Sequence, residues 1–166
     1  SLQGDVGFAE LLGRMGCQVE LRDGELRLQG PPQGGLRGID ADMRDISDTA
    51  QTLAAVAPFA SGPTRVTGIG FIRGKETDRI GAVCTELARL GVPAREEADG
   101  FTVEPALPHA GLVHTYDDHR MAMSFALLGL RVAGIEIDDP GCVSKTYPRY
   151  FDDLVAATGA RVEPAA

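Results

Sequence analysis

The chain has 166 residues, of which 43% are hydrophobic and 24% charged, a composition that suits one globular domain with its own core. A net charge of −8 argues against a general nucleic-acid surface, and no apolar run reaches the roughly 20 residues of a membrane-spanning helix. The first residues show no signal peptide, and Cys17, Cys84 and Cys142 stand in unrelated contexts that suggest no disulfide pairing. The composition therefore predicts a cytoplasmic protein with reduced thiols and neither a membrane nor a nucleic-acid partner.

The N-terminal part of the chain is expected to form a helix followed by a β-hairpin. Four apolar residues recur at helical spacing before Gly16: Phe8, Leu11, Leu12 and Met15. Strands are predicted over 18–22 and 25–29, because Asp23-Gly24 between them is a strong hairpin turn signal. The segment 30–38, rich in Pro and Gly, is expected to be a loop, and 36–43 to hold a short strand.

The middle of the chain predicts two helices with a strand between them. One helix runs to Ala60 with Ser47 or Asp48 as its cap, and Pro58 ends or distorts it. A β-branched strand over 64–69 leads to the charged stretch 73–80. Apolar residues then recur at helical spacing up to the stop signals Gly91 and Pro93: Ile80, Val83, Cys84, Leu87 and Leu90.

The remainder predicts a second hairpin, a buried helix, a strand and a final helix. Strands over 94–97 and 101–104 flank Asp99-Gly100, and a Pro-rich loop follows to about residue 112. A helix from near Asp118 to Leu130 is apolar nearly all round, so it should be buried. A strand over 135–138, a turn at 140–141 and a helix ending at Gly159 complete the chain.

These elements repeat along the chain. The Asp23-Gly24 turn corresponds to Asp99-Gly100, and Asp48 corresponds to Asp118, at a spacing of roughly 70–75 residues. This period is longer than the 20–50 residues of solenoid units, so the copies are expected to lie within one globular domain. The pattern predicts an α/β (α+β) fold built from β-α-β-α-β-β units, with an incomplete copy at each end of a single domain over 1–166.

The charged stretch 73–80 is the first candidate site. Lys75, Glu76 and Arg79 are expected at the first turn of a helix, where free N–H groups and the helix dipole favour an anion. Because Glu76 and Arg79 are three residues apart, a capping turn with a salt bridge is the alternative interpretation.

An acidic cluster precedes the helix that ends at Ala60: Asp40, Asp42, Asp45 and Asp48. A calcium loop is excluded, because Asp45 occupies the position that needs glycine and Gln51 the position that needs a bidentate glutamate. Most of these acids are interpreted as solvated or capping residues. Asp48 is the exception, because it leads an otherwise apolar helix.

Two further clusters carry cations. His119 and Arg120 open the predicted buried helix, where charged side chains must be paired or functional. A zinc site with His114 is rejected because the sequence offers no second ligand set. Lys145 lies in a loop before the last helix and taken alone is a surface lysine. Taken together, however, Lys75, Arg79, Arg120 and Lys145 are expected at the starts of three repeat-related helices. If these helices are parallel, the four cations converge on one face suited to phosphorylated substrates, with Asp48 and Glu76 among them.

Four strings along the chain resemble, in order and spacing, the C-terminal half of the 5-enolpyruvylshikimate-3-phosphate (EPSP) synthase family. The strings are Ile46-Ser47-Asp48-Thr49, Lys75-Glu76-Thr77-Asp78-Arg79, Thr115-Tyr116-Asp117-Asp118-His119-Arg120-Met121-Ala122-Met123 and Lys145-Thr146-Tyr147-Pro148. The resemblance implies condensation of shikimate 3-phosphate with phosphoenolpyruvate, without metal or cofactor. It also implies a two-domain enolpyruvyl transferase fold with pseudo-threefold units around buried helices, of which this chain holds the C-terminal part.

The resemblance implies roles for three residues near the acceptor substrate. Asp48 would hold the 5-hydroxyl and help to take its proton. Glu76 would move the proton at the enolpyruvyl methylene carbon, and Lys75 would bind shikimate 3-phosphate.

It also implies how phosphoenolpyruvate is held. Arg79 and Arg120 would bind its carboxylate, a bidentate task that suits guanidinium. Lys145 would act as an acid/base or phosphate-neutralising group, with His119 orienting its neighbours.

One position departs from the family pattern, and other assignments stay open. Phe71 stands where a polar Asn often contacts the shikimate moiety. The resemblance further implies that an N-terminal domain completes the site, that the chain alone is inactive, and that the full-length enzyme is monomeric. An enolpyruvyl transferase that uses UDP-N-acetylglucosamine and a non-catalytic module that binds phosphorylated metabolites are the alternatives.

Overall fold

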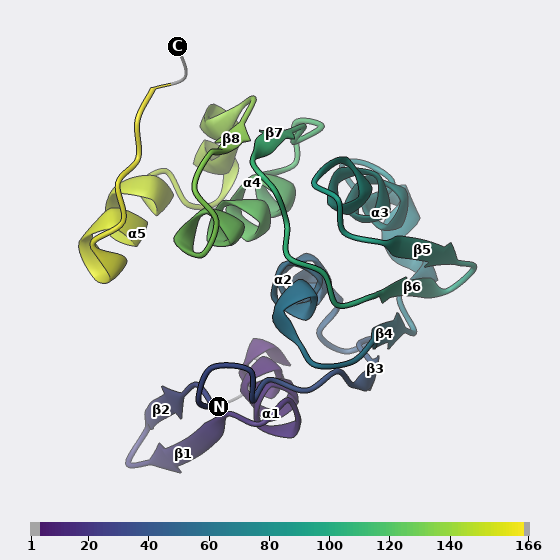
Figure 1. Cartoon of the computed structure of the whole chain (residues 1–166), viewed down its shortest axis with the longest axis vertical. Helices are drawn as coiled ribbons and strands as arrows, with labels where there is room; N and C mark the ends of the chain where they lie inside the picture. The colour runs from purple at the N-terminus through teal and green to yellow at the C-terminus, as the bar shows by residue number, and fades with distance from the viewer. Residues whose placement is uncertain (1–3, 165–166) are drawn as a thin grey trace.

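The computed structural model describes residues 4–164, whose helices and strands form three groups around a shared core (Figure 1). Helices α2 (Ala50–Val56) and α4 (His119–Ala126) pack against each other at the junction of the groups. In the described residues no helix has the length and apolar character needed to cross a membrane.

The middle of the chain forms one complete repeat. In chain order it contains β3 (Asp40–Asp42), α2, β4 (Thr64–Thr67), α3 (Arg79–Arg89), β5 (Ala94–Glu97) and β6 (Gly100–Val103). The strand order in the sheet is β3-β4-β6-β5, in which β3 and β4 are parallel and the other neighbours antiparallel. The predicted β-α-β-α-β-β unit is therefore confirmed.

The flanking groups are the two incomplete copies. The first contains α1 (Gly7–Arg14), β1 (Gln18–Arg22) and β2 (Glu25–Gln29), and its antiparallel hairpin matches β5–β6. The last contains β7 (Gly111–Val113), α4, β8 (Ile135–Ile137) and α5 (Tyr150–Thr158), and its parallel pair β7–β8 matches β3–β4. Asp48 and Asp118 thus precede equivalent helices, as the repeat predicted.

Several boundaries differ from the sequence-based expectation. The expected helix to Ala60 is split into 3₁₀ turns over Ser47–Thr49 and Ala57–Phe59 on either side of α2, because Pro58 interrupts regular hydrogen bonding. Neither Ser47 nor Asp48 makes a capping hydrogen bond, so that prediction is wrong. Strand β7 falls in the segment that was expected to be loop, and α4 continues as a 3₁₀ turn over Leu127–Leu130. Further 3₁₀ turns cover Gly4–Val6, Gly70–Gly74 and Pro140–Lys145.

The core is formed mainly by the inner faces of α2, α3 and α4 and by the central sheet. Its fully buried side chains include Leu53 on α2, Leu87 on α3 and Phe125 on α4, as well as Phe101 on β6. A hydrogen bond of 3.1 Å between the hydroxyls of Thr52 and Ser124 joins α2 to α4. The predicted burial of the apolar helix after Asp118 is confirmed as far as Leu128. This packing fixes where the N-terminal ends of the three helices lie.

The hairpin of the complete unit depends on a glycine at its turn. A Cβ atom at Gly100 would lie 1.8 Å from the carbonyl oxygen of Val66, so only glycine lets β6 approach β4 this closely.

An ion pair connects β4 to β5 across β6. Nη2 of Arg65 lies 2.6 Å from Oε2 of Glu97, and the Thr102 hydroxyl donates to the same carboxylate at 2.8 Å. The Arg65 guanidinium first, and then the Thr102 hydroxyl, lower the pKa of Glu97 from 4.5 to about 2. Because the folded-state pKa is the lower one, the pair stabilises the fold above about pH 4.5, and that contribution is lost as the pH falls toward 2.

We therefore expect Glu97→Gln to destabilise the chain at neutral pH, with the loss shrinking as the pH is lowered. Urea denaturation of wild type and variant at successive pH values measures the difference in free energy of unfolding. A difference that stays constant between neutral pH and about pH 2 contradicts this account of the pair.

Candidate functional site

Residues at or just before the starts of α2, α3 and α4 meet in one charged cluster. Its members are Asp48, Glu76, Arg79, Asp118 and Arg120. Arg79 is the first residue of α3, Asp118 directly precedes α4, and Asp48 lies in the 3₁₀ turn that precedes α2. The predicted convergence is therefore confirmed for the starts of α3 and α4 and for Asp48, whereas Lys145 does not lie at a helix start.

Arg79 is the buried centre of the cluster, with only 2% of its side chain exposed. Its Nε donates to Oδ2 of Asp118 at 2.8 Å, and its Nη2 donates to Oε2 of Glu76 at 2.7 Å. Its Nη1 donates to Oδ1 of Asp48 at 3.3 Å. A buried guanidinium requires such partners, and here three carboxylates supply them.

Asp118 is the fully buried partner in this cluster. Besides its bonds to Arg79, its Oδ1 accepts a hydrogen bond of 2.8 Å from the backbone N–H of Arg120, which caps α4. The sequence indicated Asp118 as a helix start but not as the partner of Arg79. Its equivalence with Asp48 in the repeat is the signal that could have identified it as a site residue.

Asp48 is held between two arginines and still reaches solvent, with 44% of its side chain exposed. Nη2 of Arg120 donates to Oδ2 of Asp48 at 2.8 Å, and Nη1 donates to the Asp48 backbone carbonyl at 2.9 Å. Arg120 thereby ties the first turn of α4 to the start of α2. Because both oxygens of Asp48 are bound to guanidinium groups, its orientation is fixed.

Glu76 is the second carboxylate of the cluster that reaches solvent, at 37% exposure. It precedes α3 rather than lying in its first turn, so the expected helical pair with Arg79 is instead a loop-to-helix ion pair. Nδ1 of the buried His119 lies 3.8 Å from Oε1 of Glu76 and has no hydrogen-bond partner in the described part of the chain. His119 is therefore a buried neighbour of the Glu76 carboxylate.

Lys145 reaches the cluster from a different element than expected. It ends the 3₁₀ segment Pro140–Lys145, five residues before α5, so its expected place at a helix start is wrong. Its Nζ donates to the backbone carbonyl of Asp117 at 2.6 Å and lies 2.8 Å from the Asp117 carboxylate. The hydrogen bond to Asp117 is the main reason that the pKa of Lys145 is raised.

Two residues that the sequence singled out, Lys75 and Phe71, lie on the surface. Lys75 is exposed between the 3₁₀ turn over Gly70–Gly74 and α3, and within residues 4–164 it forms no ion pair. Phe71, in the same 3₁₀ turn, is 56% exposed. Of the four predicted cations, Lys75 is therefore the one without an ion pair among the described residues.

The rest of the charged stretch supports the start of α3. Asp78 caps the helix by accepting from the N–H groups of Ile80 and Gly81, and Arg73 donates to Asp78 at 2.7 Å. Partial burial raises the pKa of Asp78, but the Gly81 N–H and the Arg73 guanidinium outweigh it and leave the pKa lowered. The capping interpretation is thus confirmed for Asp78, and the stretch contains a structural part beside the charged cluster.

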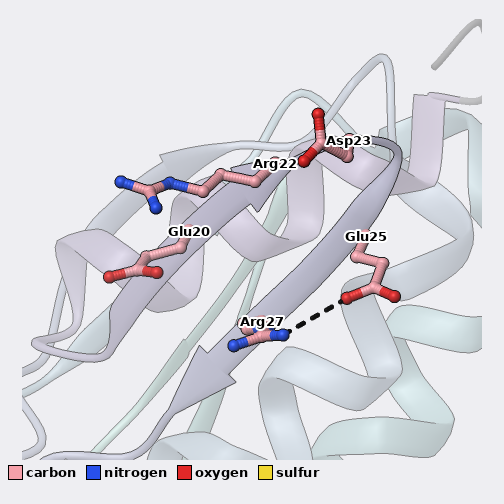
Figure 2. Close-up of a pocket in the computed structure, with 5 residues that line it drawn as sticks. All are labelled: Glu20, Arg22, Asp23, Glu25 and Arg27. Atoms are coloured by element: carbon pink, nitrogen blue, oxygen red, sulfur yellow. Dashed lines mark hydrogen bonds and ion pairs between the residues drawn. The ribbon is translucent and has the colours of Figure 1, made fainter.

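A surface hollow elsewhere is lined by charged side chains of the β1–β2 hairpin. Figure 2 shows four of these side chains on the two strands and Asp23 at the turn between them. Arg27 and Glu25 form an exposed ion pair at 3.5 Å. The lining residues are Glu20, Arg22, Asp23, Glu25 and Arg27. None of the candidate residues lies there. Over the described residues, no group of three or more His, Cys, Asp and Glu side chains is placed to hold a metal ion.

The charged cluster combines cations with carboxylates that reach solvent. Arg120 and Lys145 are partly exposed and can bind anionic groups, whereas Asp48 and Glu76 can exchange protons with a bound molecule. The arrangement suits proton transfer on a multiply anionic substrate.

Comparison with known proteins identifies the family of this chain. Residues 1–154 match the model of the family EPSP synthase (3-phosphoshikimate 1-carboxyvinyltransferase). A 3-phosphoshikimate 1-carboxyvinyltransferase from Nostoc punctiforme is 53% identical over 151 residues, which cover 91% of this chain and 35% of that protein.

Solved structures show the same fold. An EPSP synthase from Acinetobacter baumannii superposes with a TM-score of 0.80 at 26% identity, over 98% of this chain and 41% of that one. The enolpyruvyl transferase NikO from Streptomyces tendae gives a TM-score of 0.76 at 25% identity, over 96% of this chain and 36% of that one. The chain spans about a third of the length of the curated relatives that it matches.

Proposed function

The chain belongs to the EPSP synthase family, and on that basis we propose that it supplies one wall of an enolpyruvyl transferase active site. The reaction joins the 5-hydroxyl of shikimate 3-phosphate to C2 of phosphoenolpyruvate and then releases inorganic phosphate. We assign this reaction to a cytoplasmic, monomeric enzyme, and residues 1–166 to its C-terminal domain.

The observation that carries this proposal is the meeting of three separate family motifs at hydrogen-bond distance. Arg79 contacts Glu76 at 2.7 Å and Asp48 at 3.3 Å, and Arg120 contacts Asp48 at 2.8 Å. Motifs that are 31 and 72 residues apart in sequence thus share one set of ion pairs. A cluster of this kind is expected of a shared site rather than of separate helix caps.

We assign the proton transfers to the two carboxylates that reach solvent. Asp48 takes the proton of the 5-hydroxyl as the hydroxyl oxygen attacks C2 of phosphoenolpyruvate, and later gives this proton up to the departing phosphate. Glu76 delivers a proton to C3, forming a tetrahedral intermediate, and later removes a proton from C3 as the C2–O bond to phosphate breaks. One proton moves each way at C3, so Glu76 ends the cycle in its starting state.

We assign substrate binding to the cations around these carboxylates. Arg120 and Arg79 bind the phosphoenolpyruvate carboxylate, which requires Asp48 and Glu76 to share the guanidinium groups with the ligand. Lys145 neutralises the departing phosphate, the exposed Lys75 binds shikimate 3-phosphate, and the buried His119 orients Glu76. No metal or cofactor is required for any of these steps.

We further propose that the opposite wall is provided by an N-terminal domain, matching the larger part of the relatives that lies outside the matched segment. The test is a chimera in which this chain replaces the 151-residue segment that it matches in the Nostoc punctiforme protein. We expect the chimera to release phosphate from phosphoenolpyruvate only when shikimate 3-phosphate is present.

Two outcomes of the chimera experiment favour the alternatives. Phosphate release with UDP-N-acetylglucosamine but not with shikimate 3-phosphate would identify the sister reaction. A folded chimera that binds phosphoenolpyruvate without turnover, beside an active Nostoc parent protein, would identify a non-catalytic binding module.

A further inference from the structure

The turn that leads into α4 has an unusual backbone. Tyr116 and Asp117 both have positive φ angles, 56° and 55°, although neither is glycine. Consecutive residues of this kind are uncommon and persist only where the surrounding structure holds them. The turn lies directly before Asp118 of the charged cluster.

Glu86 on α3 binds this turn from one side. Its carboxylate is fully buried and accepts a hydrogen bond of 2.6 Å from the Tyr116 hydroxyl and one of 3.0 Å from the backbone N–H of His114. Nε of the partly exposed Arg89 donates a third at 3.2 Å. The mechanism proposed above does not use Glu86, so the burial of its carboxyl group requires another reason.

Asp138 binds the same turn from the other side. Its two carboxylate oxygens bond the backbone N–H of Thr115 at 3.0 Å and Nδ1 of His114 at 2.7 Å. The residues before this pair are thus held by two carboxylates, one on α3 and one directly after β8.

This turn also positions two cations of the site, Lys145 and Arg79. Asp117 offers its carbonyl and carboxylate to Lys145, and Asp118 offers its carboxylate to Arg79. Glu86 and Arg79 are seven residues apart on α3, so they share one face of the helix. One helix face therefore holds the turn at both of its ends, through Tyr116 and through Asp118.

We propose that Glu86 and Tyr116 are positioning residues for the reaction, acting through the left-handed turn on Lys145 and the Arg79–Asp118 pair. This inference rests on the proposed function and extends it to two residues that do not touch substrate. Burial first, and then the bond to Glu86, raise the pKa of Tyr116 to about 12, so its hydroxyl remains a donor at physiological pH.

The test uses Tyr116→Phe, Glu86→Gln and their combination in the chimera, with Glu136→Gln as control because Glu136 is exposed on β8. We expect Tyr116→Phe to lower kcat/KM for phosphoenolpyruvate about tenfold, the lower end of the 10–100-fold losses seen when partners of metal-binding residues are removed. The KM for shikimate 3-phosphate should stay near that of the parent. Because the two residues act as one unit, the double variant should be little worse than the worse single variant.

Two results would overturn the positioning role. One is that Tyr116→Phe and Glu86→Gln have the same kcat/KM for phosphoenolpyruvate as Glu136→Gln. The other is a matching loss for both substrates together with a large fall in Tm, which would indicate a merely structural contact.

Hydrogen exchange of the His114 amide in the isolated chain separates this inference from the proposed function. Faster exchange in Glu86→Gln and Tyr116→Phe than in Glu136→Gln supports the hold on the turn even if the parent chimera is inactive. Unchanged exchange in both variants contradicts it whatever the chimera does.

Discussion

Arg79→Leu is expected to destabilise the chain by about 3–5 kcal/mol, because it leaves the buried carboxylate of Asp118 without its charged partner. Total stabilities of single domains are about 5–15 kcal/mol, so the variant should lie close to the limit of folding. Urea denaturation of the isolated chain measures the loss as a shift of the unfolding midpoint.

Two further variants show whether the unpaired charge is the cause. Adding Asp118→Asn to Arg79→Leu removes the charge and keeps a side chain that can cap α4, so part of the stability should return. Arg149→Leu removes an exposed arginine that pairs with Asp153 on α5 and should cost about 0–1 kcal/mol. An Arg79→Leu variant as stable as Arg149→Leu would contradict the buried ion-pair account.

Glu76→Gln is expected to lower kcat of the chimera by about 10²–10⁴, because the amide cannot exchange a proton with C3 of phosphoenolpyruvate. The amide can still accept the hydrogen bond from Arg79, so KM for both substrates and the unfolding midpoint should change little. Phosphate release under saturating substrates measures the effect.

Glu96→Gln is the matched control, since Glu96 is a partly exposed glutamate that pairs with Arg73 at 3.0 Å outside the cluster. It should leave kcat unchanged. If Glu76→Gln loses no more activity than Glu96→Gln, Glu76 does not carry the proton.

Much of the fold could be predicted because its signals are local. The Asp23-Gly24 and Asp99-Gly100 turns define their hairpins, and apolar spacing defines α1, α3 and α4. β7 was missed because its three residues depend on parallel pairing with β8, 24 residues further along the chain, and a partner that distant leaves no local pattern.

The candidate site also has features that could be predicted from the sequence and features that could not. The repeat in the sequence was sufficient to predict that Asp48, Arg79 and Arg120 lie close together. The cap expected of Asp48 failed because two distant arginines bind its carboxylate instead. Asp118 and Glu86 were not recognised as site residues because their roles depend on partners 39 and 30 residues away in sequence.

The charged stretch 73–80 illustrates both outcomes. The local pattern indicated a capping turn, which Asp78 forms, whereas Glu76 and Arg79 belong to a cluster that only the tertiary fold assembles.

The central claim is that this charged cluster is one wall of a site completed by a second domain. The most direct measurement compares phosphate release from shikimate 3-phosphate and phosphoenolpyruvate by three samples. They are this chain, the separately purified N-terminal part of the Nostoc punctiforme relative, and their mixture. We predict release by the mixture and none by either part alone. Sustained release by this chain alone, or none by a mixture that forms a stable complex, would contradict the claim.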